Sequence, residues 1–151
     1  RIRLLERDLA QLDLRIARAI DGDPALRARR DLLCSMPGVG PVLAATLIAL
    51  LPELGSLPNR SAAALVGVVP YDFDSGRMRG LRCIFGGRAA IRRVLFMAAQ
   101  AATLFNATFR AFKQRLITAG KKPKVAIVAV MRKMIVTLNA MVRADTPWKQ
   151  A

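Results

Sequence analysis

The amino-acid sequence predicts an all-α fold, in which a small helical domain follows an N-terminal helix. Apolar residues recur at helical spacing through most of the 151-residue chain, and proline or glycine separates the periodic segments. The apolar content of 54% is enough to bury one domain's core. Residues 67–87 lack helical periodicity and predict one long irregular loop, with room for a short β-hairpin in the segment RMRGLRCIF.

An amphipathic helix is expected at the N-terminus. Its apolar positions form a coiled-coil-like seam, which over fewer than three heptads leaves pairing with a second helix open. The sequence DGDP then ends this helix and starts another, with Asp23 as N-cap and Pro24 at the first helical position. We therefore expect a linker or coiled-coil helix over residues 1–22 and the helical domain over residues 23–151. The seam consists of Leu5, Leu9, Leu12, Ile16 and Ile20.

The segment MPGVGPVLAATLI, residues 36–48, has the helix-hairpin-helix pattern. Its glycines let the backbone turn tightly, and Pro41 starts the following helix. The amides of such a turn, at a helix N-terminus, can hold a nucleic-acid phosphate, so Gly38 and Gly40 are candidate phosphate contacts. The alternative is a helical hairpin whose turn serves only packing, and the sequence leaves both open.

Proline and glycine also delimit the remaining helices. A short helix capped by Asn59 or Ser61 is expected to run to about residue 65. After the irregular loop, helices are expected over about 88–105, 107–118 and 123–142. Bulky apolar residues at helical spacing on these three helices are expected to lie in the core. They are Phe96, Met97, Phe105, Phe109, Phe112, Met131 and Met134.

The net charge of +15 is unevenly distributed. Residues 1–74 carry nine acids and nine Lys or Arg, whereas residues 75–151 carry sixteen Lys or Arg and one acid. A surface this basic attracts polyanions, and nucleic acid is the usual one in the cytoplasm. A membrane is not expected as partner, because the apolar runs are too short to span a bilayer and an Arg-Lys pair interrupts the longer one. Cys34 and Cys83 fit no metal spacing and indicate a reducing compartment.

The segment DFDSGRMRG, residues 72–80, places a serine among acids and arginines. A Ser-Gly pair in a loop is most often a turn, with its hydroxyl bonded to local backbone. Arginine forks, however, match phosphate oxygens and stabilise charge in a transition state. The chain has no histidine, which excludes a Ser-His-Asp triad. Asp72 and Asp74 are the nearby candidate bases, and they either assist the serine or only solvate the loop. Ser75 is therefore a candidate nucleophile for phosphoryl transfer, and a local turn remains the alternative.

Four segments carry a family resemblance: MPGVGPVLAATLIALLPELG, ALVGVVPYDFDSG, IFGGRAAIRRVLFMAAQAA and AGKKPKVAIVAVMRKM, in this order. They resemble the C-terminal domain of the transposases of the insertion-sequence 110/116/902 family, to which Piv-type DNA invertases are similar. The resemblance covers roughly residues 33–143. Its most specific element is the relative spacing of Gly67, Pro70 and the pair Ser75-Gly76.

The resemblance implies a two-part prokaryotic recombinase that acts in the cytoplasm. A resolvase-like domain holds divalent metal, such as Mg²⁺, on a cluster of carboxylates, and the C-terminal domain supplies the serine, here Ser75, which becomes linked to DNA. Transposases of this family act with a structured guide RNA, and we expect the full-length enzyme to be a homo-oligomer. The chain begins at Arg1 within a helix, so we expect it to be part of a longer polypeptide whose metal-binding domain lies outside it. Gly86, Gly87 and Arg88 depart from the family pattern at the basic loop.

Two functions are therefore considered. The first is the serine-bearing domain of a DNA transposase or recombinase, which binds DNA and guide RNA. The second is a helix-hairpin-helix module that binds nucleic acid without chemistry of its own. Besides the two hairpin glycines, the predicted nucleic-acid contacts are Arg77, Arg79, Arg82, Arg88 and Arg92 near the scissile phosphate, and Lys121, Lys122 and Lys124 farther away.

Overall fold

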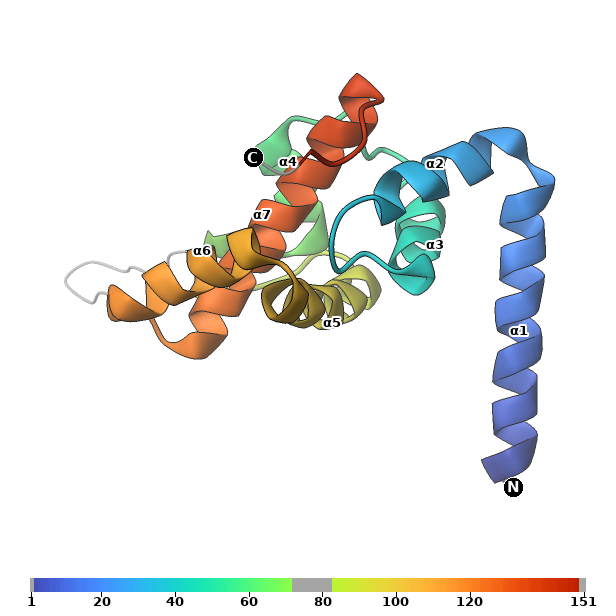
Figure 1. Ribbon diagram of the computed structural model, residues 1–151, viewed down its shortest axis with the longest axis horizontal. Helices are drawn as coiled ribbons and strands as arrows, with labels where there is room; N and C mark the ends of the chain where they lie inside the picture. The colour runs from blue at the N-terminus through green and yellow to red at the C-terminus, as the bar shows by residue number, and fades with distance from the viewer. Residues whose placement is uncertain (1, 72–82, 150–151) are drawn as a thin grey trace.

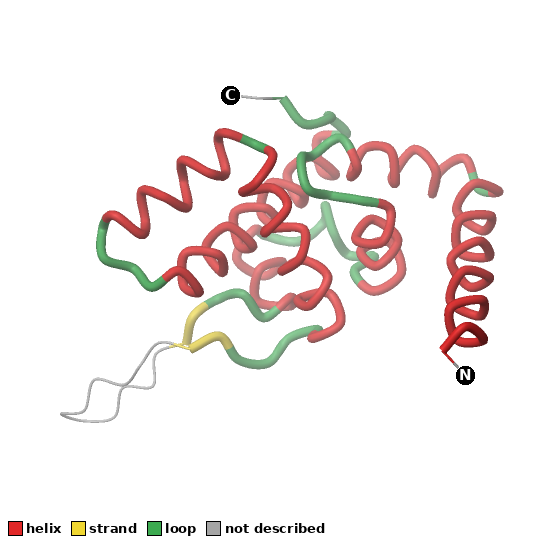
Figure 2. The backbone as a smooth tube through the Cα atoms, turned by 60° about the horizontal axis from the view of Figure 1, so that its bottom comes forward, coloured by secondary structure: helices red, strands yellow, loops and turns green. Residues whose placement is uncertain are grey.

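The computed structural model describes residues 2–71 and 83–149. Within these residues, seven helices and one two-stranded sheet follow each other, which confirms the predicted all-α class. Figures 1 and 2 show a cluster of helices from which α1 projects at one end. The elements are α1 (Ile2–Gly22), α2 (Pro24–Cys34), α3 (Pro41–Leu50), α4 (Asn59–Val66), β1 (Pro70–Tyr71), β2 (Cys83–Ile84), α5 (Ala89–Phe105), α6 (Ala107–Thr118) and α7 (Pro123–Ala144).

Helix α7 is the centre of the cluster and contacts α2, α4, α5 and α6. It is also long and apolar enough to cross a bilayer by length and composition, which the short apolar runs of the sequence did not indicate. Half of its most apolar window is buried inside the protein. Its apolar face is therefore explained by the core, as in the central helix of a bundle. The buried residues of α7 are Ala126, Ile127, Val130, Met131, Met134, Ile135, Leu138, Asn139 and Met141.

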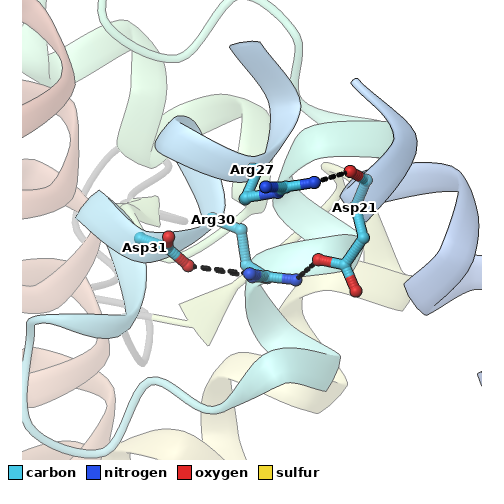
Figure 3. A network of polar contacts seen from close by, with 4 residues as sticks. All are labelled: Asp21, Arg27, Arg30 and Asp31. Atoms are coloured by element: carbon cyan, nitrogen blue, oxygen red, sulfur yellow. Dashed lines mark hydrogen bonds and ion pairs between the residues drawn. The ribbon is translucent and has the colours of Figure 1, made fainter. Parts of the chain in front are cut away.

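The corner between α1 and α2 is fixed by a helix cap and an ion-pair network (Figure 3). Asp23 caps α2 as predicted, since its carboxylate accepts a hydrogen bond from a first-turn amide of α2 at 2.8 Å. Arg30 of α2 pairs with Asp21 of α1 and, at 2.9 Å, with Asp31. Arg27 donates to the backbone carbonyl of Asp21. These contacts set the direction in which α1 leaves the helical cluster.

The seam predicted on α1 faces solvent along most of its length. Leu5 and Leu9 are each 61% exposed, and Ile20 is the buried member of the seam. An apolar groove of about 670 Å³ lies between α1 and α3. Most of the seam is therefore free to contact another helix, while pairing itself stays a prediction. The groove is lined mainly by Leu14, Ile16, Ala17, Ile20, Val42, Ala45 and Leu50.

A buried asparagine ties the loop between α3 and α4 to α7. The side-chain oxygen of Asn139, which is fully buried, accepts a hydrogen bond from the amide of Gly55 at 2.8 Å. Its side-chain nitrogen donates to the carbonyl of Leu57 and to Oδ1 of Asn59, both at 2.8 Å. Because every polar atom of this side chain has a partner, its hydrogen bonds offset the cost of removing the amide from water.

The core differs from the predicted one at two positions on α5. Met97 is 66% exposed and Phe105 is 85% exposed, whereas the buried face of α5 includes Ala98, Ala99 and Ala102. Small residues allow α5 to approach its neighbours closely, and together with Ile91 and Leu95 they form a buried face that does not include Met97 or Phe105. Phe109, Met131 and Met134 are buried as predicted, and Phe96 and Phe112 are partly buried against the core.

Two local predictions also need correction. The N-cap residue of α4 is Pro58, and no side chain caps this helix, so the predicted caps Asn59 and Ser61 are wrong. The side chain of Asn59 is instead a partner of the buried asparagine of α7. The strand Cys83–Ile84 lies in the segment where a hairpin was expected, but its partner strand is Pro70–Tyr71, upstream of that segment.

Candidate nucleic-acid interface

We call residues 72–82, which include Ser75, the serine segment. The short antiparallel sheet pairs the residues that come directly before and directly after this segment. Tyr71 pairs with Cys83, and Pro70 pairs with Ile84. Residues 72–82 connect these strands and lie outside the described residues. The sheet therefore brings the two chain ends that flank the serine side by side. The predicted site residues within this connection are Asp72, Asp74, Ser75, Arg77, Arg79 and Arg82.

We call the flanking residues 67–71 and 83–88 the base of the serine segment. A close contact between two glycines holds this base against the end of α4. Gly67 is the C-cap of α4, with φ of +76°, and Gly87 precedes α5 with φ of +70°. A Cβ atom on Gly87 would lie 2.4 Å from the backbone nitrogen of Gly67 and 2.7 Å from the carbonyl carbon of Val66. A Cβ on Gly67 would in turn lie 2.3 Å from the carbonyl oxygen of Gly86, so both positions require glycine. The amide of Arg88 adds a hydrogen bond to the carbonyl of Leu65 at 2.7 Å.

The two described arginines of the predicted scissile region form hydrogen bonds with other parts of the protein. Arg88 forms a bidentate ion pair with Glu53 at 2.7 and 2.8 Å and donates to the carbonyl of Leu50 at 2.6 Å. Arg92 donates to the carbonyls of Gly86 and, at 3.4 Å, of Val66. Both guanidiniums therefore hold protein groups in this state, and their contact with phosphate stays a prediction.

The ion pair between Glu53 and Arg88 predicts an acid-dependent contribution to stability. The Arg88 guanidinium, followed by the backbone amide of Glu53 itself, lowers the pKa of this carboxyl from about 4.5 to about 2. Because the pKa falls on folding, the pair stabilises the fold fully above the ordinary pKa and loses its effect as the pH drops towards 2. Urea denaturation should therefore show that Glu53→Gln is less stable than the wild type at neutral pH and approaches it in acid.

The matched control for this prediction is Glu6→Gln on α1, which removes an exposed carboxylate from the projecting helix. Both side chains of the Glu53–Arg88 pair are more than a third exposed, so solvent screening keeps its effect modest. A stability difference between Glu53→Gln and wild type that stays constant from neutral to acid pH would contradict the assignment.

The turn between α2 and α3 contains the two glycines of residues 36–48, and their surroundings differ, while the helix-hairpin-helix motif itself stays a prediction. Gly38 has φ of +87°, and a Cβ there would lie 2.5 Å from the carbonyl oxygen of Ala98 and 2.8 Å from the Cβ of Ala102. This glycine therefore packs the turn against α5. Gly40 is the N-cap of α3 and has open space where a Cβ would be. It lies at the N-terminal end of a helix, which favours anions. A phosphate contact at Gly40 stays a prediction.

Three lysines surround the start of α7. Lys121, Lys122 and Lys124 are exposed, and Lys122 is the N-cap residue of the helix. Gly120, with φ of +82°, turns the chain out of α6 just before them. The corner is thus open to an anionic strand. Within the described part of the chain, no three Asp, Glu, Cys or His side chains are grouped closely enough to hold a metal ion.

A basic hollow between α4, α6 and α7 was not predicted. It has a volume of about 570 Å³, and we call it the Phe112 hollow. Phe112 was expected only as a core residue, yet two cations lie over its ring. The sequence feature that could have indicated a basic hollow is the absence of any Asp or Glu from the three helices that form it. Its lining residues are Asn59, Arg60, Phe112, Ala129, Arg132, Lys133 and Val136.

Comparison with known proteins agrees with the family resemblance of the four sequence segments. The family described as "Transposase IS116/IS110/IS902 family" matches residues 30–114. The chain is 28% identical to the pilin gene-inverting proteins of Moraxella lacunata and Moraxella bovis over 144 residues, which cover 93% of this chain and 45% of each relative. It is 31% identical over 117 residues to a 43.6 kDa protein of insertion element IS110 from Streptomyces coelicolor, covering 76% of this chain and 29% of that protein. The chain thus spans less than half the length of these relatives.

Proposed function

The chain belongs to the IS116/IS110/IS902 family of transposases, and on this premise we propose that it supplies the serine nucleophile of a DNA recombinase. Family membership gives it a role in DNA recombination. The observation that carries the finer proposal is the anchored base of the serine segment, where paired strands and the contact of Gly67 with Gly87 hold the flanks of Ser75. A reacting group gains most from a rigid support, because misplacement by about 1 Å can cost about a hundredfold in rate.

In the proposed step, the hydroxyl oxygen of Ser75 attacks a DNA phosphorus atom. A bond forms between this oxygen and phosphorus, the bond from phosphorus to one sugar oxygen breaks, and the released strand end takes up a proton. Arg77, Arg79 and Arg82 bind the phosphate oxygens in this proposal and stabilise the added charge. A serine hydroxyl needs a group that accepts its proton, and we assign this role to a resolvase-like domain outside the chain, assisted by Asp72 and Asp74. The divalent metal is assigned to that domain as well.

The proposed partners are DNA, a structured guide RNA and further copies of the enzyme in the cytoplasm. The sixteen Lys and Arg of residues 75–151 support binding of a polyanion. Exposure of the α1 seam supports assembly through that helix, since apolar residues in a row on an isolated helix are unfavourable in water.

Trapping the covalent intermediate tests the proposal. The full-length protein is mixed with its substrate DNA and denatured, and a protein–DNA adduct is isolated and digested to find the attached residue. We expect a phosphodiester link to Ser75. Tight DNA binding together with recombination that proceeds through an adduct at another residue, or without any adduct, would reject the assignment. Binding with neither adduct nor recombination would favour a helix-hairpin-helix binding module.

A further inference from the structure

The Phe112 hollow combines an aromatic ring with uncompensated positive charge. Arg60 of α4 and Arg132 and Lys133 of α7 line it, and all three are exposed. None of the three helices around it carries an acidic residue. Within the described part of the chain, these cations form no ion pair with a carboxylate. Four like charges around one hollow, counting Arg115 of α6, repel one another and favour an anionic ligand.

Two positively charged side chains lie over the ring of Phe112. The ammonium nitrogen of Lys133 lies 4.7 Å from the ring centroid, and the guanidinium carbon of Arg115 lies 5.4 Å from it. A cation at this distance is attracted by the ring electrons, so each contact keeps a long side chain at the edge of the hollow. Phe112 is half-buried, so its position is fixed by the core while part of its surface stays accessible.

We propose that the Phe112 hollow binds an unpaired nucleotide of a single-stranded nucleic acid, with the base against Phe112 and the phosphates on Arg60, Arg132 and Lys133. A nucleotide matches both parts of the hollow, since its base has a planar face and its backbone carries one negative charge per phosphate. A duplex offers only phosphates to such a surface, because its bases are stacked and inaccessible to the ring. An acidic peptide offers charge without a planar face.

The inference uses none of the residues assigned to the serine chemistry, so the two proposals can fail independently. The inference rests on the proposed contact of this chain with nucleic acid, but it needs no chemistry at Ser75. Loss of the adduct would leave it intact, and loss of single-strand binding at the hollow would leave the serine assignment intact.

The experiment measures the affinity of the full-length protein for fluorescent single strands of about 12 nucleotides, within the range of one single-strand site. Oligothymidylate and oligouridylate are compared, so that the arms distinguish DNA from RNA. Inorganic polyphosphate serves as an anion without bases, and polyglutamate serves as an acidic peptide. Phe112→Leu keeps an apolar side chain but removes the ring, and it should weaken oligonucleotide binding about tenfold while polyphosphate binding changes little. Phe112→Tyr keeps the ring and should bind the oligonucleotides with the affinity of the wild type.

The charges are tested with Arg132→Glu/Lys133→Glu. The matched control is Arg7→Glu/Arg15→Glu on α1, which changes the net charge equally at the end of the molecule opposite α6 (Figures 1 and 2). The hollow variant should bind the oligonucleotides at least about tenfold more weakly than the control and lose about two from the salt slope.

Three outcomes would overturn the inference. The first is equal affinity of the hollow and control variants for oligonucleotides. The second is a Phe112→Leu variant that loses oligonucleotide and polyphosphate binding equally, or neither. The third is tighter binding of polyglutamate than of an oligonucleotide of equal charge. A helical circular dichroism spectrum like that of the wild type is required of each variant, and the comparison of Arg132→Glu/Lys133→Glu with its α1 control decides the inference if the leucine variant unfolds.

Discussion

Ser75→Ala in the full-length protein is expected to lower strand exchange by at least about three orders of magnitude, because loss of a covalent nucleophile removes the main reaction path. DNA affinity should change by less than about twofold, since binding rests on phosphate contacts with arginine and lysine. Strand exchange is measured as recombinant product formed over time, and affinity by titration of labelled substrate DNA. The covalent adduct should disappear together with strand exchange.

The control for this variant is Ser61→Ala, which removes an exposed hydroxyl from α4 and leaves the serine segment unchanged. It should recombine at the wild-type rate. Normal strand exchange by Ser75→Ala would remove the serine from the mechanism. A parallel loss of DNA affinity would instead give Ser75 a binding role and leave the nucleophile unassigned.

Helix positions were predictable because local signals fix them. Asp23 and Pro24 start α2 as the sequence indicated, and α3 and α7 each begin at a proline. Helices α5 and α6 agree with the predicted ranges to within a residue at each end. These signals act within one turn of backbone, so they need no knowledge of tertiary contacts.

The tertiary contacts of individual residues were harder to predict, because they depend on which residues of other helices and loops lie next to each one. Arg88 was predicted as a phosphate ligand from its place in a basic segment, yet its partner Glu53 lies 35 positions earlier in the chain. Met97 was expected in the core from its bulk, whereas alanines form the close contacts of α5. Arg60 and Phe112 join one hollow only because α4 and α6 both pack on α7. Sequence spacing on a single helix gives no sign of such pairings.

Gly87→Ala is the second variant with a large expected effect. Its methyl group would meet the backbone of Gly67 at 2.4 to 2.6 Å, and backbone yields less easily than the tip of a side chain. The positive φ costs about 1 to 2 kcal/mol for any residue with a Cβ, and the enforced shift adds roughly 1 to 3 kcal/mol. A total of about 2 to 5 kcal/mol is a large share of the stability of an ordinary domain. The urea midpoint measured by helical circular dichroism should fall accordingly.

Gly86→Ala is the matched control, because its residue has the same φ of +70° but nothing within 4 Å of the added Cβ. It should show only the backbone term, about 1 to 2 kcal/mol. The two variants therefore separate conformational strain from the contact that anchors the serine segment. Where Gly87→Ala still folds, displacement of that anchor should lower strand exchange by about a hundredfold relative to Gly86→Ala. Equal stability and equal strand exchange in the two variants would show that the contact of Gly67 with Gly87 neither holds the fold nor positions the serine.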